Sequence, residues 1–124
     1  LAVMSERGVL CAHSLPAAHM MQHFDRDVLD RELVDEDFRG PTGSAYLMTW
    51  GRGFTETHIA TLAAHWQVQL FCLGHQHVES GIETLGPAVI LNSDHEAGRV
   101  LPLDLANLPA AEEALMYAVP LASI

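Results

Sequence analysis

The chain has 124 residues, 49% of them hydrophobic, and its 16 acidic residues outnumber six arginines to give a formal net charge of -10. This length fits one domain that can bury a core, and the acidic balance disfavours nucleic-acid binding, which requires cations at the phosphates. The chain has no lysine, which excludes Schiff-base chemistry, pyridoxal phosphate attachment and lysine-containing phosphate loops.

The first predicted elements are a β-hairpin and a helix. Apolar residues 2–4 and 8–12 flank a turn-like cluster and predict two paired strands. Ser14 is expected to cap a following helix that tolerates Pro16 in its first turn. His13 is therefore predicted at the junction between a strand and a helix.

Residues 25–44 are dense in Asp and Glu and are predicted to form an irregular surface segment, whose acids cap helices and face solvent. The apolar run 45–50 is expected to be a strand that leads to Arg52. A helix capped by Thr55 follows. Apolar residues at helical spacing direct one face of this helix towards a sheet: Ile59, Leu62, Ala63 and Trp66.

The second half of the chain is predicted to alternate between strands and turns. Residues 68–73 form a short apolar run closed by Gly74, which predicts a buried strand. Further elements are predicted as strands at 82–85, 88–91 and 100–105, a helix near 109–116 and an apolar tail at 119–124. The pattern as a whole predicts an α/β fold with a mixed sheet and flanking helices.

The sequence carries no sign of a membrane or secretory segment. No stretch approaches the roughly 18 apolar residues of a membrane span, and no basic region followed by an apolar core opens the chain. Cys11 and Cys72 lie in apolar runs, where buried thiols act as small hydrophobic groups. We therefore expect a soluble, cytoplasmic protein. Because the chain opens at Leu1 without an initiator methionine, we also expect it to be part of a longer protein.

Two histidines follow the strand at 68–73 directly, in the run Gly74-His75-Gln76-His77. Imidazole is a common ligand for zinc, iron, nickel and manganese, and two imidazoles separated by one residue can face one ion or two adjacent ions. Open α/β sheets bind ligands at the carboxyl ends of their strands. His13 and Arg52 lie at other predicted strand ends, which makes all four side chains candidates for a metal-dependent site.

The other five histidines have simpler interpretations. His19 and His23 have the spacing of a zinc-protease pair, but the residue after His19 is not the general-base glutamate that this motif requires. His58 and His65 are expected to be partly exposed on their helix. His95 follows a strand and either reaches the site or belongs to a turn stabilised by Asn and Asp side chains.

The order of these motifs resembles the C-terminal half of the calcineurin-like metallophosphoesterases, and within them the serine/threonine phosphoprotein phosphatases. An apolar strand ends in His13, Trp50-Gly51-Arg52-Gly53 follows, and a helix and a strand lead to Gly74-His75-Gln76-His77. The resemblance covers residues 9 to about 105. It implies a four-layer αββα sandwich, with two sheets face to face and helices outside, in which residues 1–124 are the C-terminal part of one metallophosphoesterase domain.

The resemblance also implies a role for each motif. His13 and His75 would ligate one metal, while His77 ligates or adjoins the other. Arg52 would bind the phosphoryl oxygens, for which a planar guanidinium is suited. Two manganese, iron or zinc ions would activate a bridging hydroxide for phosphoester hydrolysis, with a phosphoprotein or a small phosphoester as substrate.

Several departures from the family pattern shape these expectations. Ser14-Leu15 replaces the glycine pair of the protein phosphatases, which usually also lack a histidine at the position of His77. The first-half motifs Asp-X-His, Gly-Asp-X-X-Asp and Gly-Asn-His-Glu do not occur in these 124 residues. The chain is therefore expected to be inactive alone, since it lacks the carboxylate that bridges two metals.

Two other interpretations remain open. One is a mononuclear zinc enzyme in which His13, His75 and His77 leave a fourth position for water. The other is a noncatalytic remnant of the fold that acts as an interaction module.

Overall fold

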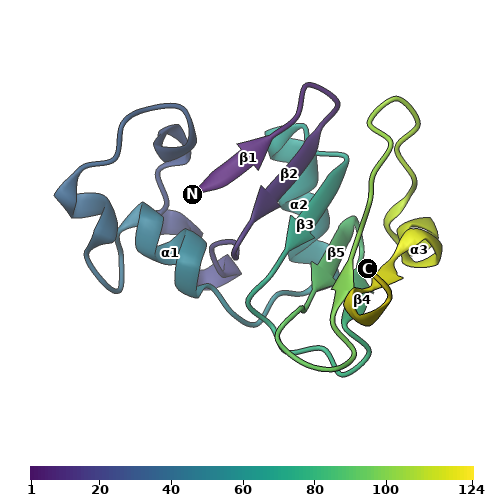
Figure 1. Cartoon of the computed structure of the whole chain (residues 1–124). Coiled ribbons are helices and arrows are strands. Elements are labelled where there is room, and N and C mark those ends of the chain that lie inside the picture. Colours follow the sequence, from purple (N-terminus) through teal and green to yellow (C-terminus); the bar gives the residue numbers. More distant parts are fainter.

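The computed structural model describes all 124 residues, and its central element is a five-stranded sheet with the order β1-β2-β3-β5-β4 (Figure 1). The strands are β1 (Ala2–Met4), β2 (Val9–Ala12), β3 (Leu70–Leu73), β4 (Ile82–Leu85) and β5 (Ala88–Leu91). The three central strands β2, β3 and β5 are parallel, whereas β1 and β4 run antiparallel at the two edges. The predicted α/β class with a mixed sheet is confirmed.

The predicted hairpin of β1 and β2 is also confirmed. The Val9 N–H donates to the Ser5 hydroxyl (3.0 Å), and Gly8 adopts a φ of 80°, which glycine accepts without a steric cost. On its other side β2 pairs with β3 in register, so that Ala12 lies opposite Leu73. The loops that follow these two residues therefore begin side by side.

The expectation of a strand at 45–50 is wrong, because these residues belong to helix α1 (Ser44–Trp50). Its buried residues have the spacing of one helix face and not the alternation of a strand: Ser44, Ala45, Leu47 and Met48. The predicted helix after Thr55 is α2 (Glu56–Trp66), and the Thr55 hydroxyl accepts the N–H of His58 (3.2 Å).

Ser14 does not cap a helix. A 3₁₀ helix, η1 (Ala18–His23), starts later, and Ala17 at its N-cap provides no side-chain bond. The Ser14 hydroxyl instead donates to the Gly51 carbonyl (2.8 Å), and Ser14 is fully buried. This bond joins the loop after β2 to the loop after α1, which positions Arg52 relative to His13.

The acidic segment contains two further 3₁₀ helices, η2 (Arg26–Leu29) and η3 (Asp35–Phe38). Asp25 caps η2 by accepting the Asp27 N–H (2.9 Å), as expected of the acids in this segment. Asp37 differs from the expectation of a solvated acid, because it is buried and accepts two hydrogen bonds from Arg31 (2.7 and 2.8 Å).

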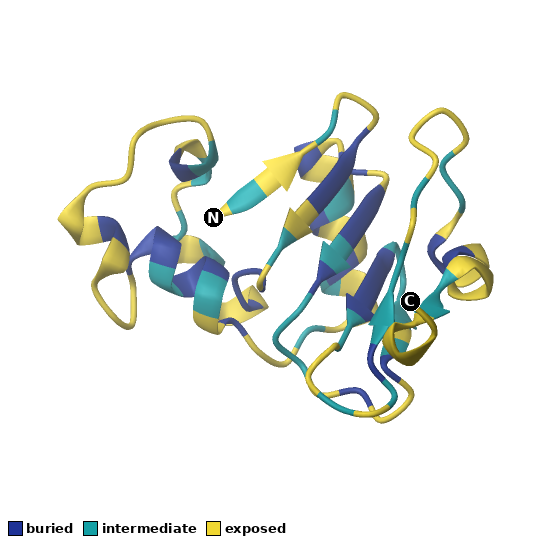
Figure 2. Cartoon of the chain, in the orientation of Figure 1, coloured by how far each residue is buried: buried dark blue, intermediate teal, exposed yellow.

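Helices cover both faces of the sheet, as the buried strands in Figure 2 indicate. On one face Ile59, Leu62 and Trp66 of α2 pack on side chains that include Leu10 and Phe71. On the other face Val9, Leu70 and Val89 pack against α3 (Ala111–Ala114).

The C-terminal region is less regular than predicted. The expected strand at 100–105 is limited to β6 (Arg99–Val100), which pairs with β7 (Val119–Pro120) in a second sheet. The expected helix near 109–116 is divided into α3 and the 3₁₀ helix η4 (Leu115–Tyr117), and the tail ends in η5 (Leu121–Ser123). None of the helices has the length and apolar character needed to cross a membrane.

Candidate metal centre

The loops that follow β2, β3 and β5 meet at the carboxyl edge of the parallel strands. They line a cavity of about 410 Å³, and its polar side chains include His13, His75, His77, Asn92 and Asp94. This edge is where open α/β sheets bind their ligands. All three histidines predicted as metal ligands therefore face one cavity.

His13 and His75 form the closest pair in the cavity. Their Nε2 and Nδ1 atoms lie 2.6 Å apart and their ring centroids 4.4 Å apart. Nitrogens bound to one tetrahedral metal at about 2.1 Å lie roughly 3.4 Å from each other, so a small rotation of the two rings away from each other lets both bind the same ion. His75 has a φ of 69°, a left-handed backbone that is uncommon outside glycine and is concentrated at functional sites.

The surroundings of His75 favour the neutral imidazole that a metal requires. The Trp50 and His75 rings lie nearly perpendicular to each other, with 5.6 Å between the ring centroids, and the buried Nε2 atom of His75 has no hydrogen-bond partner. Burial lowers the pKa of His75, and electrostatic repulsion from the neighbouring Arg52 and His13 side chains lowers that pKa further. A free nitrogen lone pair is thus available at neutral pH.

A second group of donors lies in the same region and consists of His77, Asp94 and His95. One ligand atom from each lies within 4.8 Å of the other two. The Asn92 amide donates to the Asp94 carboxylate (2.7 Å), and the His95 Nε2 atom lies 3.0 Å from the Val78 carbonyl. The His95 Nδ1 atom accepts the Ala97 N–H (3.2 Å), so both ring nitrogens of His95 have partners within the protein. The contact from Asn92 to Asp94 is of the kind that orients the ligands of metal sites. The three side chains are a possible metal-binding cluster.

Arg52 stands apart from both groups. Its guanidinium donates to the Gly51 carbonyl (3.3 Å) and lies 6.0 Å from the centroid of the Trp50 ring. It is exposed and forms no ion pair, since the four ion pairs of the chain involve other arginines. Its charge is nevertheless close enough to influence His75. An unpaired cation beside the cavity can attract an anion.

The arrangement divides the three predicted histidine ligands. His13 and His75 contact each other, whereas the donor atoms of His77 gather with those of Asp94 and His95. The ligand atoms of His13, His75 and His77 do not all lie within 4.8 Å of one another.

Asp94 was missed as a site residue in the sequence. Asp94 lies in a polar turn after a predicted strand, and this position at a strand end is the feature that made His13 and His75 candidates. His95, for which two interpretations were open, is brought to the site by this turn.

The remaining predicted residues lie outside the centre. The His58 ring bonds to the Pro16 carbonyl (2.9 Å), and His65 is exposed on α2. Cys11 is exposed, contrary to expectation. Burial raises the pKa of Cys72 to about 12, so this thiol is protonated at neutral pH.

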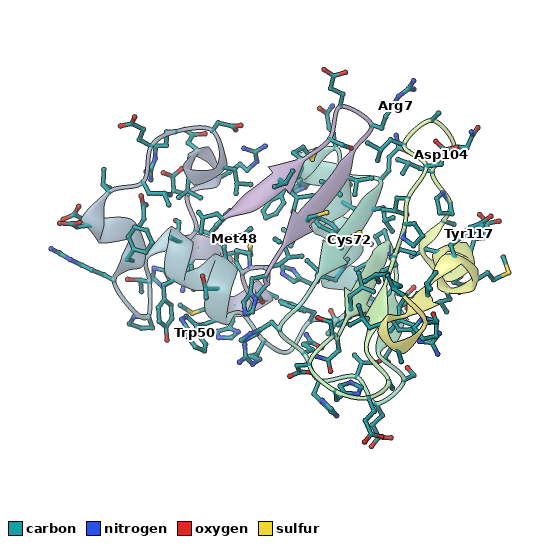
Figure 3. All side chains as sticks on the ribbon, in the orientation of Figure 1. Arg7, Met48, Trp50, Cys72, Asp104 and Tyr117 are labelled. Atoms are coloured by element: carbon teal, nitrogen blue, oxygen red, sulfur yellow. The ribbon has the colours of Figure 1, made fainter.

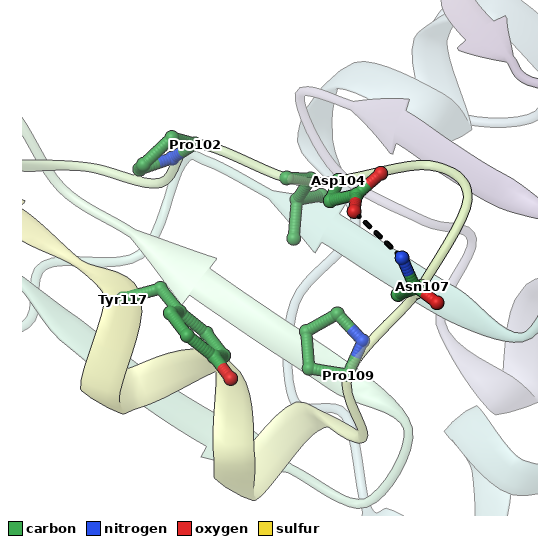
Figure 4. Close-up of a pocket in the computed structure, with 6 residues that line it drawn as sticks. Pro102, Asp104, Asn107, Pro109 and Tyr117 are labelled. Carbon is green, nitrogen blue, oxygen red and sulfur yellow. Dashed lines mark hydrogen bonds between the residues drawn. The ribbon is translucent and has the colours of Figure 1, made fainter.

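Another cavity, of about 520 Å³, lies beside η4 (Figure 4). Its lining includes Asp104, Asn107 and Tyr117, and it contains no histidine or arginine. The Asp104 carboxylate accepts the Asn107 amide (2.9 Å), which lowers the pKa of Asp104. Because its one charged group is already bonded within the loop, this cavity offers less chemistry than the histidine-lined edge.

Comparison with known proteins gives no assignment: no family model matches the chain, and no curated protein matches it. The functional argument therefore depends on the geometry at the carboxyl edge of the sheet.

Proposed function

We propose that the chain supplies part of the metal centre of a metal-dependent phosphoester hydrolase. The observation that carries this proposal is the meeting of two donor groups at one cavity: His13 with His75, and His77 with Asp94. Imidazole and carboxylate donors suit zinc, manganese and iron. The lowered pKa of His75 also fits a metal ligand.

The residues of this chain have distinct tasks in the proposed reaction. His13 and His75 hold one ion, and His77 and Asp94 hold a second, with Asn92 orienting the Asp94 carboxylate. Arg52 binds the phosphoryl oxygens of the substrate and neutralises part of their charge. The bound ions would supply Lewis-acid activation of water and of the phosphoester.

We further propose that a second sheet packs against the face of the sheet that carries Val3 and Cys11. Across β1, β2, β3 and β5 this face presents the register-paired residues Val3, Cys11, Cys72 and Val89. Val89 is fully buried beneath α3, whereas Val3 is 71% exposed. A second layer over the uncovered end would give the four-layer sandwich that the sequence resembles.

The proposed centre lacks one component. Asp94 is the one carboxylate that lines the cavity, whereas the family that the sequence resembles uses a carboxylate to bridge two metals. We therefore expect these 124 residues by themselves to bind metal without hydrolysing p-nitrophenyl phosphate.

The test measures metal binding and hydrolysis in the same preparation. Equilibrium dialysis against Mn²⁺, Zn²⁺ and Co²⁺ should show binding that His75→Ala weakens at least about tenfold, since loss of a ligand costs at least as much as loss of an outer-shell contact. His65→Ala is the matched control, because this histidine is exposed on α2.

Each outcome of this test bears on a different part of the proposal. Equal binding by the wild type and the His75→Ala variant would overturn the metal centre. Manganese-dependent hydrolysis that His75→Ala abolishes would support the hydrolase and overturn the expected inactivity. One tightly bound zinc per chain with hydrolysis would favour the mononuclear enzyme.

A further inference from the structure

A small cavity lies at the end of α1, and Trp50 in its lining contacts His75 of the metal centre. It has a volume of about 220 Å³, and its lining includes His19, Tyr46, Trp50 and Arg52. Trp50 is the last residue of α1 and is 55% exposed, whereas the other tryptophan, Trp66, is buried in the core. Figure 3 shows Trp50 at the end of α1, away from the sheet. A large aromatic side chain is thus available to a ligand.

Trp50 links this cavity to the metal centre through direct contacts. Its ring centroid lies 5.6 Å from that of His75, which is part of the closest donor pair. On the other side its centroid lies 6.4 Å from that of Tyr46. A molecule with one group at His75 and another on the aromatic rings therefore needs to extend only a few ångströms.

The charges around the cavity favour an anion. Arg52 lies over the Trp50 ring and has no carboxylate partner, although the chain carries a formal net charge of -10. His19 is exposed at the same cavity. A guanidinium beside an aromatic face is suited to a ligand that combines a phosphate with a planar ring.

We propose that Trp50 and Tyr46 form an aromatic subsite, so that the centre takes phosphate monoesters of planar aromatic alcohols or of nucleosides. This inference rests on the proposed function, because the phosphate is placed at Arg52 and the histidine pair. Trp50 stacks on the ring of the ligand, and Tyr46 extends the stacking surface. Trp50 is thus a specificity-determining residue and takes no part in bond breaking.

The experiment compares ligands that share a phosphate and differ in the ring. The 124-residue chain with Mn²⁺ is titrated with AMP, phenyl phosphate and ribose 5-phosphate, by calorimetry and by tryptophan fluorescence. Stacking of a base on an aromatic side chain strengthens binding about 5- to 150-fold. AMP is therefore expected to bind at least about fivefold more tightly than ribose 5-phosphate and to change the Trp50 emission. A preference for phenyl phosphate over AMP would identify an aryl ester as the ligand.

Three variants distinguish the contribution of the Trp50 ring from that of the Arg52 charge. Trp50→Leu should remove the AMP preference and leave ribose 5-phosphate binding within about twofold, and Trp50→Phe should restore most of the preference. Arg52→Gln should weaken all three phosphates. Circular dichroism confirms that each variant is folded.

The outcomes distinguish this inference from the proposed function. Equal affinity for AMP, phenyl phosphate and ribose 5-phosphate, or equal weakening of all three by Trp50→Leu, would overturn the aromatic subsite while the metal-binding result stands. Absence of binding by all three ligands would overturn both the subsite and the phosphate-binding role of Arg52.

Discussion

At the residue scale, Asp37 is the acid that the fold removes from solvent. Its carboxylate accepts two bonds from Arg31 and one from the Val34 N–H (2.9 Å), and these contacts lower the pKa of Asp37 to about 2. Arg31 also holds Asp25 (3.0 Å) and lowers its pKa. One guanidinium therefore organises the acidic segment that precedes α1.

This ion pair predicts a specific acid sensitivity. The folded pKa of Asp37 lies below its ordinary value of 3.8, so the carboxylate stabilises the fold above about pH 4 and loses this effect as the pH falls towards 2. Asp37→Asn should lower the urea midpoint at pH 7, and the difference from the wild type should shrink below pH 4.

The test is a pair of urea titrations monitored by circular dichroism, one at pH 7 and one at about pH 2.5. The stabilisation by the Asp37 carboxylate is complete at the first pH and largely lost at the second. Glu36→Gln is the control, because its pair with Arg39 is exposed and contributes little. Identical midpoints for wild type and Asp37→Asn at pH 7 would contradict the argument.

His75 and Asp94 show how single residues define the centre. His75 is held between His13 and Trp50, with a left-handed backbone that turns its ring towards His13. Asp94 is fixed by the Asn92 amide. Both belong to short turns directly after parallel strands, so the geometry of the centre depends on the register of the sheet.

At the element scale, the loops after β2 and α1 approach each other so closely that only glycine fits at position 51. A Cβ atom at Gly51 would lie 1.6 Å from the Leu15 carbonyl oxygen, and the Gly51 carbonyl accepts the buried Ser14 hydroxyl. These contacts leave no room for a side chain. They place Trp50 and Arg52 beside the loop that carries His13.

Gly51→Ala is expected to destabilise the protein by about 3 kcal/mol or more, because the overlap is with backbone and exceeds ordinary core overpacking. Gly74→Ala is the matched control, since its nearest contact would be an ordinary 3.7 Å from the His13 carbonyl oxygen. Thermal and urea unfolding of both variants provide the measurement. Equal stability of the two variants would show that the loops can separate without cost.

At the scale of the whole molecule, the two faces of the sheet are covered unequally. α2 covers one face along several strands, whereas α3 covers the other face only around Val9, Leu70 and Val89. An open apolar cavity on that face is lined by residues that include Leu1, Val3 and Leu91. Figure 2 shows β1 largely in the colour of exposed residues.

This exposed apolar surface predicts association at high concentration, because contiguous apolar patches tend to be covered. Val3→Glu should reduce both association in sedimentation velocity and binding of a hydrophobic dye. Met116→Gln is the control, since Met116 is 76% exposed at η4 and does not line this cavity. Indistinguishable behaviour of wild type and Val3→Glu would argue against an unpaired sheet face.

Local patterns in the sequence determined the hairpin, α2 with its Thr55 cap, the central strands and the placement of His13 and His75 at strand ends. These features depend on residues near one another in the chain: alternating apolar side chains, a capping hydroxyl and a glycine after a strand. The α/β class follows from their order.

Only the tertiary structure decided which of these residues meet. It joined His13 to His75, brought Asp94 and His95 to His77, paired Arg31 with Asp37 and used Ser14 to hold Gly51. It also made α1 a helix, because burial of one face outweighs the apolar run that suggested a strand. Each of these outcomes depends on segments distant in sequence packing together, which local spacing does not encode.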